Sequence, residues 1–273
     1  MSSAAERTPG AATSLPRTMR RLEPAAIAGV MSREVANFRT YWRGTTFSSV
    51  LEPLVYLLAF GLGLGATLVD EVDGVPYIQF VGTGMVATAV IFSSALPAMF
   101  GTFVKHRFQN TYEAILAAPV DVDELVTAEM LWIGARSAVY GCVPLIVTFF
   151  WGLDPAPGML LVPLFAFVTA LGFAGFGVTM AATVAKIDQF NYVTALFVTP
   201  LFLVAGTFFP IDGLPQFFQL IAQANPLHQL VELVRAGAFG FEWADLARFA
   251  FLVAFAFATW RVAIARMRAR LIQ

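Results

Sequence analysis

Hydrophobic and polar positions alternate along this chain in long blocks rather than residue by residue. No Asp, Glu, Lys or Arg occurs in residues 53–69, 74–104, 137–153, 155–185 or 189–211. An α-helix needs about 20 apolar residues to cross about 30 Å of hydrocarbon. The blocks therefore predict an all-α integral membrane protein with six transmembrane helices, near residues 48–69, 78–103, 131–151, 159–184, 190–209 and 246–265.

The first and last of these spans carry charged residues near their ends. The first span needs Glu52 inside its first turn to reach full length. The last is bounded by Arg248 and Arg261, whose long side chains can extend to the two interfaces. Glu52 and Arg136 are the only charged residues predicted deep enough in the membrane to serve chemistry there.

A stripe of apolar residues at helical spacing precedes the first span. It consists of Ile27, Val30, Met31, Phe38, Tyr41 and Trp42, and the opposite side holds Arg33, Asn37, Thr40 and Arg43. The pattern predicts an interfacial amphipathic helix over residues 24–46, with its aromatic end at headgroup level. This helix is either a simple membrane anchor or a surface that also contacts a cytoplasmic partner.

A second apolar stripe lies in the loop between spans two and three. Asn110 followed three residues later by Glu113 resembles a capping box, and Pro119 ends the predicted helix. Its apolar face consists of Phe108, Tyr112, Ile115 and Leu116. The alternative is that this segment is only a tight connector between two spans, but a connector needs no apolar face. We therefore expect this cytoplasmic helix to dock into a groove of another protein.

Residues 207–245, between spans five and six, are apolar but interrupted by proline and glycine. They predict two short helices, the second capped by Asn225 with Pro226 at its first position. We expect this pair to dip into the outer leaflet and return, where irregular backbone must be buried in protein or line a cavity. His228 is either a pH-sensitive group or a capped interfacial histidine. The candidate residues of this external re-entrant segment are Phe209, Pro210, Pro215, Asn225, Pro226 and His228.

Composition narrows the class further. The chain is 58% hydrophobic and only 13% charged, whereas a soluble domain carries about 25% charged residues. This excludes a disordered chain, a nucleic-acid binder and an ordinary cytosolic enzyme. A single cysteine, Cys142, excludes an intrachain disulfide, and with two histidines it supplies too few ligands for a zinc or haem site.

Basic residues gather on one side of the predicted membrane. With both termini in the cytoplasm, the inner side holds 14 of the 17 Lys and Arg residues, the outer side holds two, and Arg136 falls in a span. The positive-inside rule therefore places both termini in the cytoplasm and the chain in the cell membrane. We expect residues 1–23 to be a disordered cytoplasmic tail, 47–265 the six-span domain and 266–273 a basic cytoplasmic tail.

The chain lacks the motifs of an energy-coupling enzyme. No G-x-x-x-x-G-K-[ST] sequence occurs, because neither Lys105 nor Lys186 follows a glycine. The predicted spans also lack the paired Asp, Glu or His residues that proton-coupled carriers use. Glycines cluster instead at 61–65, 82–84 and 172–177, where they serve either close helix packing or a lumen lining.

Several local strings resemble one family of membrane transporters. They are VYLLAFGLGLGA (55–66), YIQFVGTGMVA (77–87), QNTYEAILAAPVDVDELVTAEMLW (109–132), DQFNYVTALFVTPLFLVAGTFFPIDGLP (188–215) and NPLHQLVELVR (225–235). With the six spans and the broken outer pair, they resemble the ABC-2 class of ABC-transporter permeases, and most closely the Nod-factor (lipooligosaccharide) exporter branch. The resemblance covers roughly residues 25–265, and its most specific parts are F-F-P-x-D-x-L-P and N-P-L.

The resemblance implies a permease subunit without its own ATPase site. It implies a second permease subunit, self or paralogue, and two P-loop ABC ATPase subunits that bind ATP and Mg, while this chain binds no cofactor. The coupling helix would contact the ATPase through Phe108, Asn110, Thr111, Tyr112, Glu113, Ile115, Leu116 and Pro119. Substrate would pass between the subunits along spans one, two and five, with Glu52, Tyr56, Phe92, Phe197 and Phe202 as candidate pathway residues.

The expected function is therefore ATP-driven export of a lipid-linked saccharide, a glycolipid or an amphipathic drug across the cytoplasmic membrane. The alternatives are a channel or carrier that ATP does not drive, and a membrane-embedded enzyme or scaffold. Co-purification separates them, because a permease of this class brings a P-loop ATPase with it. Membrane lipid is an expected partner, and nucleic acid is not.

Overall fold

The computed structural model describes residues 22–64, 71–72, 74–213 and 215–271. The predicted disordered tail at residues 1–23 lies almost wholly outside these ranges. So do residues 65–69, the last part of the predicted first span.

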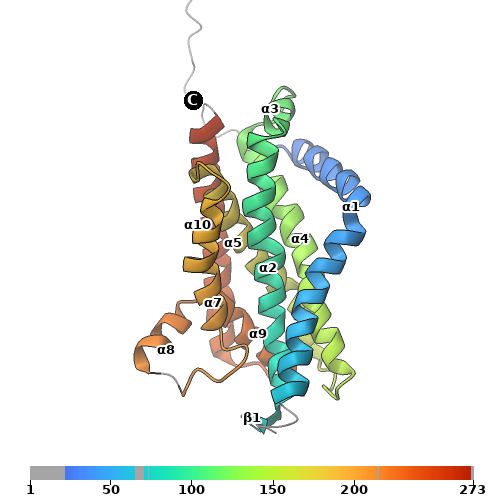
Figure 1. Ribbon diagram of the computed structural model, residues 1–273, viewed down its shortest axis with the longest axis vertical. Coiled ribbons are helices and arrows are strands. Elements are labelled where there is room, and N and C mark those ends of the chain that lie inside the picture. Colours follow the sequence, from blue (N-terminus) through green and yellow to red (C-terminus); the bar gives the residue numbers. More distant parts are fainter. Residues whose placement is uncertain (1–21, 65–70, 73, 214, 272–273) are drawn as a thin grey trace, which may run out of the picture.

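Four long apolar helices form the body of the protein. They are α2 (Tyr77–Arg107), α4 (Val122–Phe149), α5 (Val162–Thr183) and α10 (Trp243–Leu271), and the 3-10 turn η2 (Pro157–Leu161) leads into α5. In the described part of the chain, these are the four helices long and apolar enough to cross a membrane. They lie side by side in Figure 1 and correspond to the predicted spans two, three, four and six.

Two of these helices extend well beyond the predicted spans. α4 begins at Val122 rather than near 131, because the Glu124 carboxylate accepts the Asp121 backbone N–H at 2.9 Å and so starts the helix in the loop. α10 continues to Leu271, so most of the predicted basic tail at 266–273 is helical. Hydropathy marks only the part of a helix that faces lipid, whereas caps and ion pairs decide where it ends.

The predicted interfacial helix and first span are one continuous helix, α1 (Pro24–Leu58), followed by the π-helix η1 (Ala59–Leu64). α1 changes direction part-way along its length in Figure 1, but residue 46 is not a break in the helix. Pro24 lies in the first turn, where its missing N–H has no helical partner to lose.

The apolar face of α1 is covered by the chain itself. Val30 is buried, and Ile27 and Met31 pack with it against residues of α4 and α10. The Phe38 ring meets Trp132 edge-on at 5.5 Å. The face predicted to lie open at the membrane interface is therefore an internal packing surface, while the aromatic residues at 41 and 42 are exposed.

The fifth predicted span, 190–209, is helical only over Gln189–Leu203. It consists of α6 (Gln189–Val193), the π-helix η3 (Thr194–Val198) and α7 (Thr199–Leu203). At 1.5 Å per residue this is about 22 Å, which is less than the hydrocarbon thickness of about 30 Å. The predicted end was wrong because the chain turns after Leu203, with Gly206 at φ +79°, a backbone conformation that favours glycine.

The end of the molecule away from the C-terminus holds a hairpin and two short helices. Strands β1 (Glu71–Val72) and β2 (Val75–Pro76) pair antiparallel, and α8 (Gln216–Gln223) and α9 (Pro226–Phe239) follow later in the chain. We call this the hairpin end. α3 (Thr111–Leu116) and the C-terminal end of α10 lie at the opposite end, the α3 end (Figure 1).

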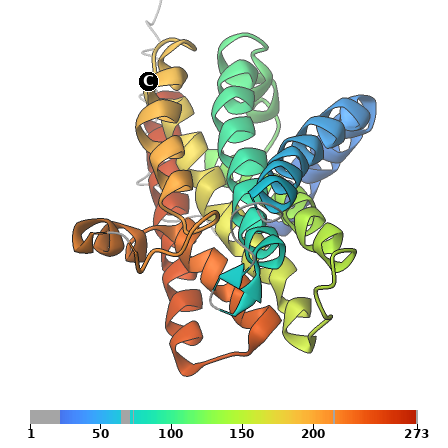
Figure 2. The same cartoon turned by 60° about the horizontal axis from the view of Figure 1, so that its bottom comes forward.

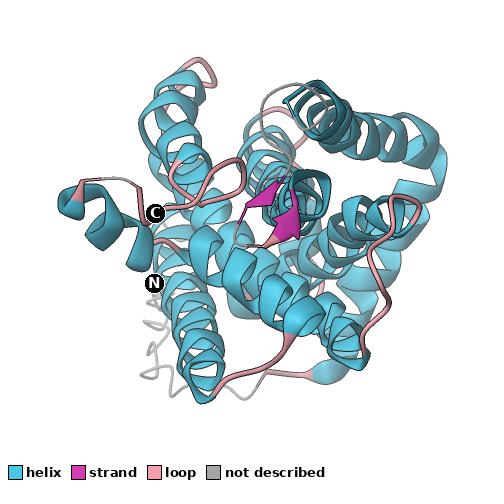
Figure 3. Ribbon diagram, turned by 90° about the horizontal axis from the view of Figure 1, so that it is seen from below, coloured by secondary structure: helices cyan, strands magenta, loops and turns pink. Residues whose placement is uncertain are grey.

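The two helices of the outer segment have different surroundings. α8 projects from the side of the bundle in Figures 2 and 3, and Phe217 and Leu220 on it are 69% and 68% exposed. α9 is a core helix instead: Leu227, Leu230 and Val234 are fully buried, and the helix packs against α2, α5 and α10. Whether this pair re-enters a leaflet stays a prediction.

Glycines allow the central helices to approach closely. A Cβ added at Gly177 of α5 would lie 2.7 Å from the Ala95 carbonyl oxygen of α2. One added at Gly175 would lie 2.9 Å from the Met130 methyl group of α4. These glycines therefore serve helix packing, the first of the two roles that the sequence left open.

Candidate functional site

α3 stands at one end of the molecule, between α2 and α4. Asn110, just before it, has φ +49° and makes no side-chain cap. The predicted capping box of Asn110 and Glu113 is therefore wrong, because a capping side chain reaches the helix from an extended backbone. Asn tolerates the left-handed conformation better than most residues do, so Asn110 serves the tight turn out of α2. Thr111 is buried, and Pro119 lies exposed beyond the C-terminus of α3.

The outward surface of α3 is formed by some of the predicted docking residues. Glu113 is exposed, and Phe108 at the start of the turn is 67% exposed. Ile115 and Leu116 are half-buried and pack against the cluster that contains Val122. Of the predicted contact residues, Phe108, Asn110, Glu113 and Pro119 are therefore the ones whose side chains are exposed, and only Phe108 offers a large apolar surface.

Tyr112 points into the protein and not toward a partner. Its side chain is 1% exposed, and its hydroxyl donates a hydrogen bond to the Glu129 carboxylate of α4. The interpretation of Tyr112 as a docking anchor is therefore wrong, because a fully buried ring has no surface to offer. Tyr112 instead fixes α3 to the bundle.

Glu129 belongs to a buried charge cluster that joins three long helices, α1, α2 and α4. The Lys105 ammonium of α2 lies 2.8 Å from the Glu34 carboxylate of α1 and 2.9 Å from that of Glu129. The Arg33 guanidinium lies 3.0 Å from the second oxygen of Glu34. The side chains of Lys105, Glu34 and Glu129 are only 17%, 4% and 3% exposed. We call Glu34, Lys105, Tyr112 and Glu129 the buried network.

The buried network makes a mechanical connection between α3 and the long helices. Each carboxylate is held by more than one donor, as a buried charge must be to offset its lost hydration. If α3 moved while Glu129 stayed in place, the buried Glu129 carboxylate would lose its hydrogen bond from Tyr112. Loss of a partner for a buried carboxylate is costly in free energy. The buried network therefore links α3 to α4 directly, through Tyr112 and Glu129, and to α1 and α2 through Lys105.

The predicted pathway residues Tyr56, Phe92 and Phe202 lie together where α1, α2 and α7 meet, and we call these three rings the aromatic face. The Phe202 ring centroid is 6.3 Å from that of Tyr56 and 5.5 Å from that of Phe92. Tyr56 and Phe202 also line a cavity of about 620 Å³ together with Phe60 and Phe208. The structure thus brings three of the predicted pathway residues together from helices that correspond to spans one, two and five.

The two other predicted pathway residues lie at or beyond the edge of this face. Glu52 is exposed and lines a smaller cavity of about 270 Å³ with Phe92, Ser48 and Ser49. Phe197 packs against Phe176 of α5 at 6.3 Å and does not join the aromatic face. Its place as a pathway residue is therefore not supported by contact with the other four.

The predicted residues of the outer segment gather at the hairpin end. Phe209 and Pro210 line the 620 Å³ aromatic cavity. Pro215 is the N-cap of α8, and Asn225 caps α9 by accepting the Leu227 N–H at 3.0 Å, with Pro226 at the first helical position. His228 is half-buried on α9, with Nδ1 3.2 Å from the Ala205 carbonyl oxygen.

Titratable side chains in the described ranges do not form a metal centre. The structure groups no three or more His, Cys, Asp or Glu side chains there in a way that could hold a metal ion. The arrangement consists of a short helix with one exposed side, a buried charge linkage and an aromatic face beside a cavity.

Comparison with known protein families identifies the class. Residues 26–239 match the model of the family described as ABC-2 type transporter. The chain belongs to the ABC-2 type transporter family. This confirms the resemblance found in the local strings, and it makes the protein a membrane transport permease of a family that works with ABC ATPase partners.

Individual ABC-2 relatives agree with this assignment. Nodulation protein J of Sinorhizobium fredii is 31% identical over 199 residues, which cover 71% of this chain and 75% of the relative. Nodulation protein J of Rhizobium leguminosarum bv. viciae is 31% identical over 204 residues, which cover 73% of this chain and 78% of the relative. The inner membrane transport permease YadH of Escherichia coli is 25% identical over 240 residues, which cover 86% of this chain and 93% of the relative.

Glu34 and Glu129 are the members of the buried network that hydropathy does not reveal. Helical spacing does contain a signal for both. Glu34 lies four residues from Val30 and from Phe38, and Glu129 lies four residues from Leu125 and from Ile133. An acidic residue inside an apolar stripe at this spacing must find a buried cation.

Proposed function

We propose that this ABC-2 chain is the membrane subunit of an ATP-driven exporter, assembled from two permease subunits and two P-loop ATPase subunits. The observation that carries the proposal is the buried network, which ties the exposed helix α3 to α1, α2 and α4. A short helix that is exposed on one side and rigidly linked on the other suits the transfer of motion from a partner. ATP and Mg would bind to the partner ATPase and not to this chain.

The α3 end would face the cytoplasm. The positive-inside rule supports this orientation, because α3, the basic C-terminal end of α10 and the start of α1 share that end. In this orientation α1–η1 and the segment α6–α7 would be the first and fifth of six spans. The short length of α6–α7 suits a span that is completed by the turn at residues 204–209.

The substrate would pass between two permease copies. The helices α1 and α6–α7 beside the aromatic face present large exposed apolar side chains, which are Phe47, Val55, Tyr192, Leu196, Phe197 and Leu203. A second permease subunit, self or paralogue, would cover part of this surface, and membrane lipid the rest. The aromatic rings at 56, 92 and 202 would then border the pathway from one side.

The substrate class would be a lipid-linked saccharide, a glycolipid or an amphipathic drug. The aromatic face offers apolar surface for a hydrocarbon tail, and Glu52, Ser48 and Ser49 offer polar groups beside it. The resemblance to the lipooligosaccharide exporter branch supports the same class. The alternative is a channel or carrier that ATP does not drive, or a membrane-embedded scaffold.

Reconstitution tests this proposal. The chain is purified from its native membrane together with any P-loop ATPase that accompanies it, and both are placed in vesicles with a fluorescent lipid-linked oligosaccharide. We expect movement of the oligosaccharide across the bilayer to require ATP and to stop when the catalytic residues of the ATPase are changed. Movement at the same rate without ATP would favour the channel or carrier.

A further inference from the structure

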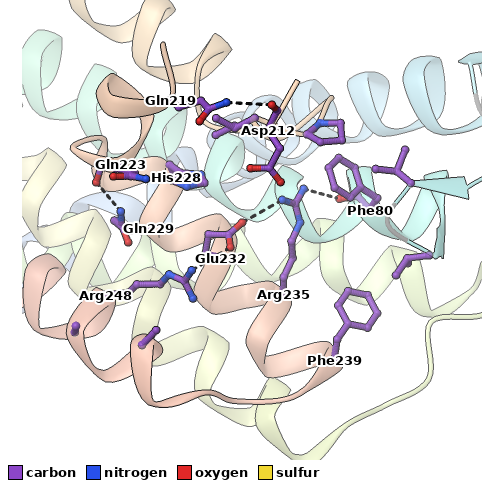
Figure 4. Close-up of a pocket in the computed structure, with 16 residues that line it drawn as sticks. Phe80, Asp212, Gln219, Gln223, His228, Gln229, Glu232, Arg235, Phe239 and Arg248 are labelled. Atoms are coloured by element: carbon purple, nitrogen blue, oxygen red, sulfur yellow. Dashed lines mark hydrogen bonds and ion pairs between the residues drawn. The ribbon is translucent and has the colours of Figure 1, made fainter. Parts of the chain in front are cut away.

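A second cavity lies at the hairpin end, separate from the aromatic face. Its volume is about 880 Å³, and it shares only Val72 and Pro210 with the aromatic cavity. Figure 4 shows side chains from α8, from α9, from the start of α10 and from the loop before α8 pointing into it. A cavity of this size suits a small molecule, since ligand pockets measure about 300–1,000 Å³.

The charged side chains of this cavity balance one another. The Glu232 carboxylate lies 3.4 Å from the Arg235 guanidinium and 3.4 Å from that of Arg248. Arg248 also pairs with the buried carboxylate of Asp245 at 2.5 Å, and Asp212 points toward Arg235 in Figure 4. In the cavity wall two guanidinium groups therefore face two carboxylates, those of Glu232 and Asp212, and the cavity has no excess of positive charge.

The position of Arg235 is fixed by further contacts. Its guanidinium lies 3.8 Å from the centroid of the Phe80 ring and donates to the Gly206 carbonyl oxygen at 2.8 Å. Burial lowers the pKa of His228 below its usual value, and the charges of Arg235 and Arg248 act in the same direction, against Glu232. The imidazole is therefore neutral at pH 7 and adds a donor and an acceptor without adding charge.

Three amide side chains complete the polar wall. The Gln219 amide donates to the Asp212 carbonyl oxygen at 3.0 Å, and the Gln229 amide donates to the Gln223 carbonyl oxygen at 2.6 Å. Each amide group carries both donors and an acceptor. The ring of Phe239, half-exposed, adds an apolar surface beside them.

This chemistry selects among ligand classes. A phosphate or carboxylate would need cations that are not already compensated by carboxylates. A hydrocarbon tail would leave many polar groups without partners. A neutral group rich in hydroxyls, which donates and accepts at many points and has an apolar ring face, satisfies amides, balanced ion pairs and an aromatic ring together.

We propose that the 880 Å³ cavity binds the neutral saccharide portion of the exported molecule at the hairpin end of the permease. This inference rests on the proposed function for its physiological role. In the proposed orientation the cavity opens on the outer side of the membrane. It would hold the sugar head after passage while the tail leaves along the aromatic face, whose cavity shares the wall residues Val72 and Pro210 with this one.

Direct binding measurements test the site. The permease with its ATPase is placed in lipid nanodiscs and titrated with two neutral tetrasaccharides, of glucose and of N-acetylglucosamine, and separately with inorganic phosphate. We expect at least one tetrasaccharide to bind and phosphate not to compete with it. The double variant Gln223→Ala/Gln229→Ala should raise the dissociation constant by about tenfold, which corresponds to about 1.4 kcal/mol.

Matched variants separate the cavity from its surroundings. Gln216→Ala changes the same residue type on α8, the helix that carries Gln223, but outside the cavity, and should leave the dissociation constant unchanged. Phe239→Ala should weaken binding, while Phe217→Ala, an exposed ring on α8 that does not line the cavity, should not. All five positions have side chains that are at least partly exposed, so folding is expected to persist.

Each other outcome has a definite meaning. No tetrasaccharide binding, competition by phosphate, or equal loss in Gln216→Ala would overturn the site. If ATP-driven export persists in the same preparation while the saccharide fails to bind, the site is refuted and the proposed function stands. If the saccharide binds but ATP drives no export, the proposed function is refuted and the binding site stands.

Discussion

Removal of the Lys105 ammonium group is the sharpest test of the buried network. In Lys105→Met, the carboxylates of Glu34 and Glu129 lose the cation that lies 2.8 Å and 2.9 Å from them. Both carboxylates are almost completely buried. Breaking a buried ion pair by removing one partner destabilises a protein by about 3–5 kcal/mol. At about 2–4 °C per kcal/mol for a chain of this size, the unfolding midpoint should fall by roughly 10 °C.

Thermal unfolding in detergent, followed by tryptophan fluorescence, measures this effect, since the chain has five tryptophans. Lys186→Met is the matched control, because Lys186 is exposed and is the only other lysine. The triple variant Lys105→Met/Glu34→Gln/Glu129→Gln removes the charges together and should recover more than half of the loss. If Lys105→Met and Lys186→Met unfold at the same temperature, the network does not connect the helices energetically and the reasoning fails.

Three further predictions concern other parts of the chain. Phe108→Ala should weaken binding of the ATPase by about tenfold or more in a pull-down titration, whereas Phe150→Ala, an exposed ring at the hairpin end, should not. Gly177→Ala should destabilise the protein by about 1–3 kcal/mol through overpacking against α2, whereas Gly101→Ala, which meets nothing within 4 Å, should not; denaturant unfolding measures both. Because burial lowers the pKa of His228, the unfolded chain binds the proton more readily, and stability should decrease as the pH falls through about 6.5. His228→Gln should reduce this acid sensitivity, and unchanged sensitivity in unfolding scans at pH 7.5 and pH 5 would contradict the assignment.

Periodicity and hydropathy could predict the helical membrane class and the positions of the four long helices. They could also place short helices at 111–116, 216–223 and 226–239, because Pro119, Pro215 and Pro226 interrupt the chain there. Helix ends were less predictable. The capping of α4 by Glu124 and the turn at Gly206 depend on side-chain and backbone geometry that a hydropathy pattern does not contain.

The sequence pattern did not predict which side of α3 faces the bundle. Tyr112 shares an apolar stripe with Phe108, and the sequence does not tell which of the two faces a partner and which faces the chain itself. Tyr112 is buried because Glu129, far along the chain, supplies a partner for its hydroxyl. Long-range pairing of this kind also explains why Glu34 and Lys105 were not recognised as one site.

Site-specific photo-crosslinking in the native membrane tests the central claim, that α3 receives an ATPase, most directly. A photoreactive residue is placed at Glu113 on the exposed side of α3, and in a separate variant at the exposed Gly213 of the hairpin end. Crosslinked proteins are then identified by mass spectrometry. We expect position 113 to capture a protein with a G-x-x-x-x-G-K-[ST] motif and position 213 not to capture one. Capture of the ATPase from position 213, or of no ATPase from position 113, would contradict the claim.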